Sequence, residues 1–369
     1  MKIVLPQKVL TKKIQGISAV VPTKTSLPIL STFLMEVKKD KLHLTANDLD
    51  VSLTTVIECE IEGEGTIAVP GKKFFEIARS LPNDNVNIKA EGEKLGVQCK
   101  RSRFRIVGKN AEEFPKLPEQ KPLASFKIKT EIINSMIEKT IYAVSNDLTR
   151  PSLCGVLWET KDGRLTMVAT DGHRLAKVDH TGDFKNLEGK EFIVSPKALN
   201  ILRSLIDEKE EVEISLAENH ITFDLGDSII YSRLIEGPFP DYNQVVPKNN
   251  KKEMVVNREE LTDACRRVAI LSSAITHQVK LSVGVEMLTL SVNTPDVGEA
   301  VEELHSTFSG EPLEIGYNAR YLLDILKTIN TVDIAFLLDR SDNTGIVIPV
   351  EGDKEIEQQC LLMPLRLGD

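Results

Sequence analysis

The feature that most constrains this sequence is an internal repeat with a period of about 123 residues. Three segments, 41–48, 164–171 and 287–294, alternate apolar with polar residues and run into a turn rich in Asp, Asn or Thr. Leu42, Leu165 and Leu288 hold the same place in each segment. Such alternation is typical of a half-buried strand. A unit of this length can bury its own core, so the repeat predicts three similar domains and not a solenoid.

A helix is expected after each of these strands, at 72–81, 196–205 and 320–329. The apolar positions recur at a spacing of 124 residues, and we expect them to form the buried face. They are Phe75, Leu199, Leu323, Ile77, Ile201, Ile325, Leu81, Leu205 and Ile329. Another helix is expected near the start of each third.

Two helices and several antiparallel strands in each third make the predicted fold class α+β, with three tandem similar domains. Pro115, Pro118 and Pro122 cluster near the first boundary, and Pro247 precedes the polar run 248–252 at the second. We therefore predict domains at 1–121, 122–248 and 249–369.

Composition excludes several classes of protein. Apolar residues make up 41% and charged residues 27% of the 369, which is typical of a globular protein and not of a disordered one. No apolar run approaches the roughly 20 residues of a membrane span. The first six residues hold too short an apolar stretch for a signal peptide, so we expect a cytoplasmic protein. Five widely spaced cysteines with no CxxC pair are expected to be reduced, and neither a metal site nor a cofactor is predicted.

Basic residues recur on corresponding helices although the net charge is −9. Arg79, Arg203 and Lys327 occupy one position of the repeated helix, and the first helices of the thirds add Lys12, Lys139 and Arg267. Any one of these residues could simply belong to a solvated helix face. Their recurrence instead favours a surface that binds the phosphate backbone of nucleic acid without reading base sequence.

One segment could suggest catalysis. Residues 169–176 read Ala-Thr-Asp-Gly-His-Arg-Leu-Ala, and Asp171 with His173 could form an acid–base pair. The corresponding turn of the first third has Asp48 but no neighbouring histidine. A turn that shapes a surface is therefore the favoured interpretation, and the chain shows neither a P-loop nor an HExxH motif.

Five short motifs resemble the family of the bacterial DNA polymerase III β subunit, the sliding clamp. They are 25–30 (TSLPIL), 69–75 (VPGKKFF), 169–176 (ATDGHRLA), 239–242 (FPDY) and 363–367 (MPLRL). The resemblance covers the whole chain. It implies a head-to-tail homodimer whose three domains per chain form a ring around duplex DNA. It also implies no catalytic activity and a role in tethering the polymerase, which gives processivity.

The resemblance further implies a groove between the second and third domains. Short peptides of the polymerase III alpha subunit, the clamp loader, other polymerases and repair proteins would bind there. The matching residues are Leu153, Thr170, Gly172, His173, Arg174, Leu175, Pro240, Val245, Leu361, Met363, Leu365 and Arg366. Two features depart from the family: Pro151-Ser152 replaces aromatic residues at the rim, and Gly368-Asp369 extends past the usual end.

The resemblance also places Lys24, in the loop before Leu27, toward DNA. The expected DNA-facing residues are Lys24, Arg79, Arg203, Lys327, Lys12, Lys139 and Arg267. Phe104 and Ile106 would meet Ile270 and Leu271 of the partner subunit. Two alternatives stay open: a scaffold with peptide grooves but no DNA in its centre, and an enzyme that uses Asp171 and His173.

Overall fold

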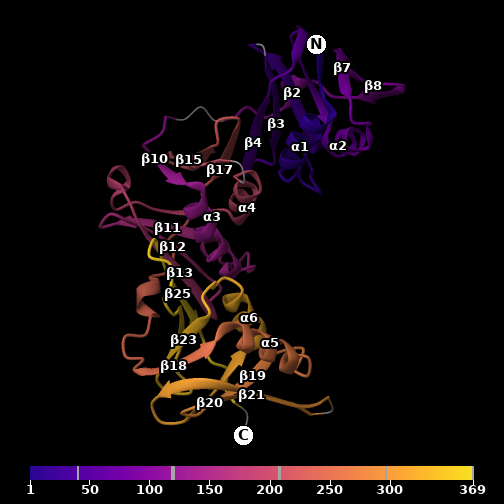
Figure 1. Cartoon of the computed structure of the whole chain (residues 1–369). Coiled ribbons are helices and arrows are strands. Elements are labelled where there is room, and N and C mark those ends of the chain that lie inside the picture. Colours follow the sequence, from indigo (N-terminus) through magenta and orange to yellow (C-terminus); the bar gives the residue numbers. More distant parts are fainter. Residues whose placement is uncertain (40, 118–120, 207–208, 296, 368–369) are drawn as a thin grey trace. The chain divides into compact units, whose positions relative to one another are not determined.

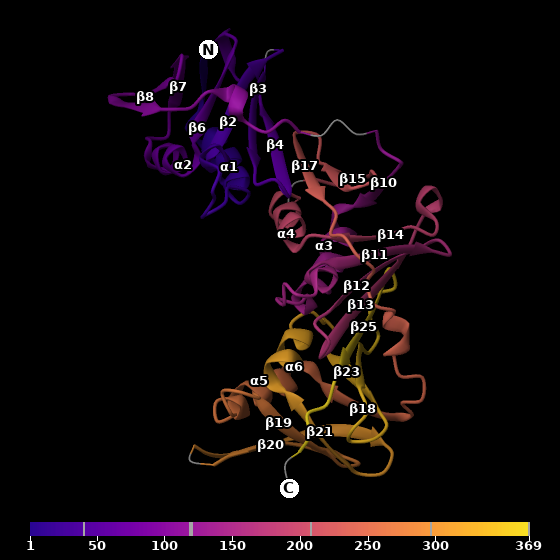
Figure 2. The same ribbon diagram turned by 180° about the vertical axis from the view of Figure 1, so that it is seen from behind.

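The computed structural model describes residues 1–39, 41–117, 121–206, 209–295 and 297–367. The chain forms two compact units, the first made of residues 1–131 and 197–234, the second of 132–196 and 235–369. Pro118 and the extension Gly368-Asp369 lie outside the described residues. Each unit is described by itself below (Figures 1 and 2).

Unit 1 contains two antiparallel sheets. Across the smaller sheet the strands run β5 (Glu60–Gly63), β1 (Lys2–Pro6), β7 (Asn85–Glu91), β8 (Lys94–Cys99) and β9 (Ser102–Val107). Across the larger sheet they run β10 (Ala124–Lys129), β15 (Glu211–Leu216), β16 (His220–Asp224), β17 (Ser228–Arg233), β4 (Val51–Ile57), β3 (Lys41–Asn47), β2 (Thr32–Lys38) and β6 (Gly65–Pro70).

Unit 2 contains one antiparallel sheet of twelve strands. Their order is β14 (Glu191–Val194), β11 (Val156–Lys161), β12 (Arg164–Thr170), β13 (Arg174–Thr181), β25 (Ile356–Leu362), β24 (Gly345–Pro349), β23 (Asp333–Leu338), β18 (Lys252–Asn257), β21 (Gly298–Ser309), β20 (Met287–Thr294), β19 (Gln278–Val283) and β22 (Leu313–Asn318).

Six α-helices cover these sheets, two in each third of the sequence. They are α1 (Gln7–Ser18), α2 (Gly71–Ser80), α3 (Thr130–Glu138), α4 (Pro196–Leu205), α5 (Arg258–Ala269) and α6 (Ala319–Leu326). Helices α1 and α2 lie side by side in unit 1, as α5 and α6 do in unit 2 (Figures 1 and 2). Asn318 caps α6, because its side chain accepts the N–H groups of Arg320 and Tyr321.

Of the residues expected on the buried face of the repeated helix, Leu81, Leu199, Ile201, Ile325 and Ile329 are buried, and the face also includes the position one residue before the first expected one. Phe74, Ala198 and Leu322 are fully buried, and so are Ala78, Leu202 and Leu326. Phe75 and Leu323, by contrast, are only half-buried. Alanine is a weak apolar signal, so the sequence pattern favoured the larger neighbouring side chains.

The sheets continue from one repeat into the next by the same kind of strand contact. In unit 1, β4 of the first repeat pairs with β17, from Val51↔Ser232 to Thr55↔Ser228. In unit 2, β13 of the second repeat pairs with β25, from Arg174↔Leu362 to His180↔Ile356. β4 is paired with β3, and β13 is paired in the same way with β12. In both cases this strand of one repeat joins the last strand of the following repeat, β17 or β25.

Two strands, one in the first repeat and one in the third, lack such a contact with a neighbouring repeat. β9, the last strand of the first repeat, lies at the edge of its sheet. Residues 298–305 of β21 pair with β20, and in the described part of the chain no strand lies on their other side. An open strand edge presents unpaired backbone groups that can pair with another chain.

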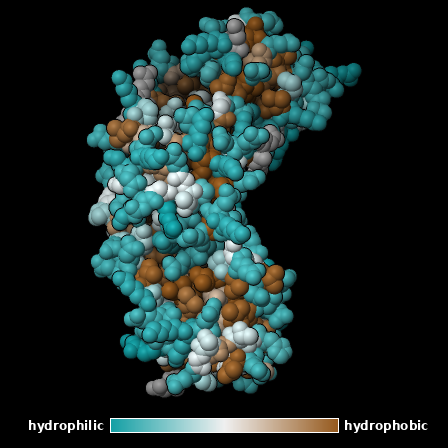
Figure 3. Space-filling model, turned by 60° about the vertical axis from the view of Figure 1, so that its left-hand side comes forward, coloured by the Kyte–Doolittle hydropathy of each residue, from teal (hydrophilic) through white to brown (hydrophobic). Residues whose placement is uncertain are grey.

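The surface drawn in Figure 3 is mostly polar and is interrupted by apolar patches. None of the helices in the described ranges is both long and apolar enough to span a membrane. The described residues hold no group of three or more His, Cys, Asp or Glu side chains that could ligate a metal. All five cysteines are free thiols.

Candidate functional site

A cavity of about 250 Å³ opens in unit 2, where strands of the second and third repeats meet the linker between them. Leu153, Leu175 and Leu361 form its buried apolar floor. Val245 and Met363 stand half exposed at its rim, with exposed fractions of 53% and 45%. A concave, mainly apolar surface with a few polar groups is the usual form of a ligand site.

Nine of the twelve expected groove residues line this cavity. They are Leu153, Thr170, Gly172, Arg174, Leu175, Pro240, Val245, Leu361 and Met363. The pairing of β13 with β25 brings Leu175 opposite Leu361, although the two residues lie far apart in the sequence. A strand pair between repeats therefore builds the floor.

Three expected groove residues lie outside the cavity. His173 is 67% exposed and contacts the ring of Tyr321. The backbone N–H of Leu365 bonds to Gly316 O at 2.8 Å, and Arg366 O accepts a bond from Gln278 Nε2. These bonds draw the end of the chain along β22 and away from the cavity.

The cavity also has four lining residues that the sequence analysis did not select: Arg150, Asp241, Tyr242 and Thr344. Arg150 Nε donates to Asp147 Oδ2 at 2.9 Å. Asp241 and Tyr242 belong to the motif 239–242, which carried the signal that could have identified them. Thr344 lies just before β24, where no sequence pattern marks it.

The turn at 170–173 forms one side of the cavity and is held by its own side chains. Thr170 Oγ1 accepts the N–H of Gly172, whose φ of +92° favours glycine. Asp171 Oδ1 accepts the N–H groups of His173 and Arg174 at 2.9 and 3.1 Å. His173 Nδ1 lies 4.0 Å from Asp171 Oδ1, which is beyond hydrogen-bond reach. This geometry supports a turn that shapes a surface over an acid–base pair.

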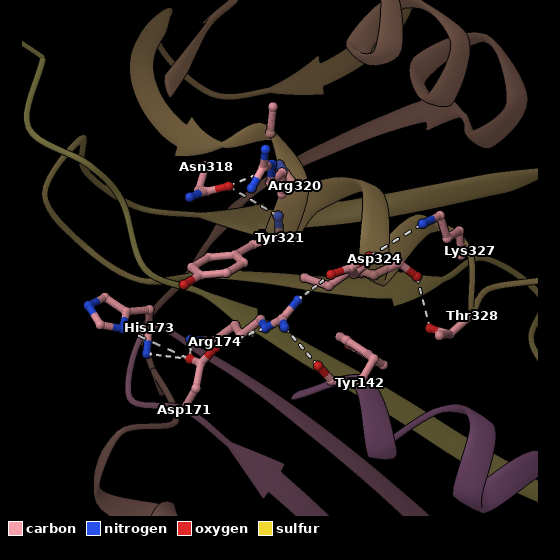
Figure 4. Close-up of polar contacts among 12 residues, drawn as sticks. Tyr142, Asp171, His173, Arg174, Asn318, Arg320, Tyr321, Asp324, Lys327 and Thr328 are labelled. Carbon is pink, nitrogen blue, oxygen red and sulfur yellow. Dashed lines mark hydrogen bonds and ion pairs between the residues drawn. The ribbon is translucent and has the colours of Figure 1, made fainter. Parts of the chain in front are cut away.

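Arg174 is the most highly connected residue of this site (Figure 4). Its Nε donates to Asp171 Oδ2 at 3.1 Å, and one terminal nitrogen donates to Asp324 Oδ2 at 2.7 Å. The other terminal nitrogen donates to the backbone oxygen of Tyr142 at 2.7 Å. The guanidinium also lies over the rings of Tyr142 and Tyr321, at 5.3 and 4.4 Å from the ring centroids. Charge-assisted bonds of this kind fix the geometry of a site.

The expected DNA-facing residues differ in how free their charges are. Lys12, Lys24 and Arg79 are exposed, and Arg203 is half-buried. Lys327, just after α6, pairs with Asp324 at 3.4 Å. Arg267 donates two bonds to the carboxylate of Glu302, at 2.7 and 3.0 Å.

Lys139 contradicts the expectation that it faces DNA. Its side chain is buried, and its Nζ donates to Thr328 O and Gln358 Oε1, both at 2.9 Å. Burial lowers the pKa of Lys139 below its ordinary value. The residue follows α3, where its long side chain turns into the protein, a direction that the repeat pattern did not reveal.

The residues expected at the dimer contact belong to different units, Phe104 and Ile106 to unit 1 and Ile270 and Leu271 to unit 2. Ile270, directly after α5, is 78% exposed, and Leu271 is half-buried. Phe104 on β9 is half-buried. Ile106 on the same strand is only 9% exposed and faces the core, so it has little surface to offer a second chain.

Three tandem α+β repeats, joined by continuous sheets and carrying an apolar groove beside the last strand, define the class of ring-type clamp folds. Comparison with protein families identifies the DNA polymerase III beta subunit. Its N-terminal domain model matches residues 1–118, its central domain model 127–241 and its C-terminal domain model 243–366. The chain therefore belongs to the DNA polymerase III beta subunit family, and its function is that of a DNA sliding clamp.

Individual relatives agree over the full length. The chain is 35% identical to the Beta sliding clamp of Pseudomonas aeruginosa and 32% identical to that of Vibrio cholerae, with all of both chains covered in each case. The structure of the Pseudomonas aeruginosa clamp bound to griselimycin has a TM-score of 0.94 at 34% identity, and that of the Thermotoga maritima beta subunit has 0.93 at 29%. In both comparisons the matched region includes the whole of this chain and the whole of the other chain.

Proposed function

We propose that two copies of this chain close head to tail into a ring around duplex DNA and tether the replicative polymerase to it. The observation that carries the proposal is the repeated strand contact between successive domains. β4 joins β17 and β13 joins β25. The third member of the series, β21, has β20 on one side of residues 298–305 and no strand on the other side within the described chain. The open edge of β9 is the corresponding last strand of the first repeat. By the same rule, β21 would pair with β9 of the partner subunit.

Charge supports this pairing. The exposed side chains of β9 include Arg103 and Arg105, whereas β21 carries Glu299 and Glu303. Opposite charges on two facing patches favour their encounter and fix their register. The contact is heterologous because it joins different surfaces, and such contacts form a closed ring when the rotation between copies allows it. Ile270, Leu271 and Phe104 would add apolar area.

The groove is proposed to hold short peptides of the polymerase III alpha subunit, the clamp loader, other polymerases and repair proteins. An apolar floor of three leucines suits small apolar anchors on such peptides. Met363 at the rim can adapt to different ligands because its side chain is flexible and polarizable. We propose that griselimycin, which is bound to the clamp of Pseudomonas aeruginosa, would occupy this same groove here.

DNA would be contacted through scattered basic residues and not through base edges. The proposed set is Lys24, Arg79, Arg203, Lys327, Lys12 and Arg267, without Lys139. Contacts of Lys and Arg with phosphates are independent of sequence and weaken as salt rises, which suits sliding. We infer that the protein is a non-catalytic subunit that works in the cytoplasm, with domains at 1–121, 122–248 and 249–369. The three family matches support a division into three domains, although the C-terminal model begins at residue 243, before the proposed boundary.

The test is retention on DNA after loading, with nicked circles and linear DNA compared at moderate salt. A topological link predicts that the protein stays on circles and runs off the ends of linear DNA. Equal loss from both would mean that only electrostatic contacts hold the protein, which would refute the ring and favour a scaffold.

A further inference from the structure

One carboxylate connects the groove with a basic residue at the C-terminal end of α6. Asp324 does not line the cavity. Its Oδ2 accepts a 2.7 Å bond from Arg174, which does line it, and its Oδ1 accepts a 3.4 Å bond from Lys327 (Figure 4). The two oxygens of a single side chain thus serve two cations.

Arg174 has little freedom to bind a peptide itself. Its side chain is only 10% exposed, and Asp171, Asp324 and Tyr142 accept bonds from it on three sides. Asp171 in turn accepts the backbone N–H groups that shape the turn at 170–173. Arg174 therefore holds the turn in place, and Asp324 supplies the contact that reaches it from α6.

Lys327 is in a different situation, because its side chain is 60% exposed. It holds one position of the basic series that we propose to face DNA. A carboxylate 3.4 Å away offsets part of its charge, so a phosphate attracts it less than it would attract an unpaired lysine.

We propose that Asp324 is a positioning residue that links the peptide groove to DNA contact. With its charge present, Arg174 keeps the turn ordered and Lys327 is partly neutralised. Without that charge, the turn loosens and Lys327 becomes available to phosphate. This inference rests on the proposed function and adds a coupling between its two surfaces.

Asp324→Asn in the full-length protein tests the proposal with two measurements. Calorimetry gives the Kd for griselimycin, and anisotropy of a labelled short duplex over a salt series gives the salt dependence of DNA binding. We expect griselimycin to bind about tenfold more weakly, the usual size of couplings within one hydrogen-bond network. We expect the salt slope to steepen by about 0.9 per chain, because one more phosphate contact forms.

Opposite changes in the two measurements distinguish this role from a merely structural one. A loosened α6 would weaken both kinds of binding, and that result would overturn the proposal, as would two unchanged values. Asp263→Asn is the matched control, because it removes a comparable ion pair with Arg266 on α5. It should leave the affinity for griselimycin unchanged.

Double variants locate the effect. In an Arg174→Lys background, Asp324→Asn should weaken griselimycin binding no further, and in a Lys327→Ala background it should no longer steepen the salt slope. If Asp324→Asn lowers griselimycin affinity further in the Arg174→Lys background, Asp324 does not act through Arg174. If the Asn variant unfolds at a lower temperature, Asp324→Glu, which keeps the charge, should bring griselimycin affinity back toward that of the wild type.

The wild-type protein separates this inference from the function on which it rests. Wild-type protein that neither binds griselimycin nor stays on circular DNA would refute the proposed function and this inference together. Wild-type protein that does both, with Asp324→Asn behaving identically, would refute only the role of Asp324.

Discussion

Tyr242 Oη donates a 2.6 Å hydrogen bond to Glu159 Oε2 and so joins the linker after the second repeat to β11. Burial and this bond to a carboxylate raise the pKa of Tyr242 well above its ordinary value. Because Tyr242 also lines the cavity, the bond fixes the linker wall of the groove.

Replacing Tyr242 with Phe should destabilise the protein by about 1–3 kcal/mol, because Glu159 loses a partner in a partly buried place. The thermal unfolding midpoint should fall, and griselimycin should bind less tightly. Tyr231→Phe, on β17 in unit 1, is the matched control and should change the affinity for griselimycin little. Equal effects of both substitutions would show that the bond has no special role at the groove.

Val245→Glu should reduce peptide binding without harming the fold. The side chain lines the cavity and is 53% exposed, so a carboxylate there stays hydrated in the free protein. A bound apolar ligand would remove that hydration, and we expect an affinity loss of about tenfold to a hundredfold for griselimycin. Val332→Glu, at a 73% exposed valine outside the cavity, should leave the Kd unchanged. An equal loss of griselimycin affinity in both variants would show that Val245 has no specific role in the groove.

Charged residues at Ile270 and Leu271 should convert the proposed dimer into monomers. The double variant Ile270→Glu, Leu271→Glu replaces apolar contact area with two carboxylates, which the proposed interface would have to remove from water without a partner. Light scattering should then give the chain mass of 41.0 kDa in place of twice that mass. Leu148→Glu, at an exposed leucine elsewhere, should remain dimeric. A stable dimer of the double variant would contradict the assigned interface.

Lys139 should make stability depend on pH in the alkaline range. Burial lowers its pKa in the folded chain, whereas the unfolded chain keeps the proton up to the ordinary value of 10.5. The unfolded state then binds more protons, so the contribution of this group to stability rises with pH up to that value. Compared with Lys139→Met, the wild-type protein should gain unfolding free energy as the pH rises through the alkaline range toward 10.5. A constant difference would mean that the lysine titrates alike in both states.

The sequence predicted the repeated elements well because their signals are local. Alternation over 41–48 and its two copies corresponds to β3, β12 and β20, and the helices α2, α4 and α6 lie at the expected places. Five of the nine residues expected on the buried face of those helices are buried, but the sequence pattern did not include the equally buried positions 74 and 78 and their counterparts. Ala78 packs as completely as Leu202 but carries no strong apolar signal.

Side-chain direction could not be predicted in the same way. Lys139 is one of the basic residues that the first helices of the repeats add, yet tertiary acceptors on Thr328 and Gln358 draw it inward. Leu365 fits the motif of the groove, but its backbone pairs with Gly316. Both outcomes depend on contacts between segments far apart in the chain, which a periodic pattern does not encode.

The ladders β4–β17 and β13–β25 each carry a short covalent linker beside them, whereas a β21–β9 ladder between copies would not. A linker of this kind holds its two ends at an effective concentration in the millimolar range. A broken ladder within the chain is therefore remade at once, whereas two copies whose β21–β9 ladders have both broken come together again only as often as two molecules meet. In the proposed ring, the contact between copies would thus be the one that can separate completely, and it is there that we would expect DNA to enter.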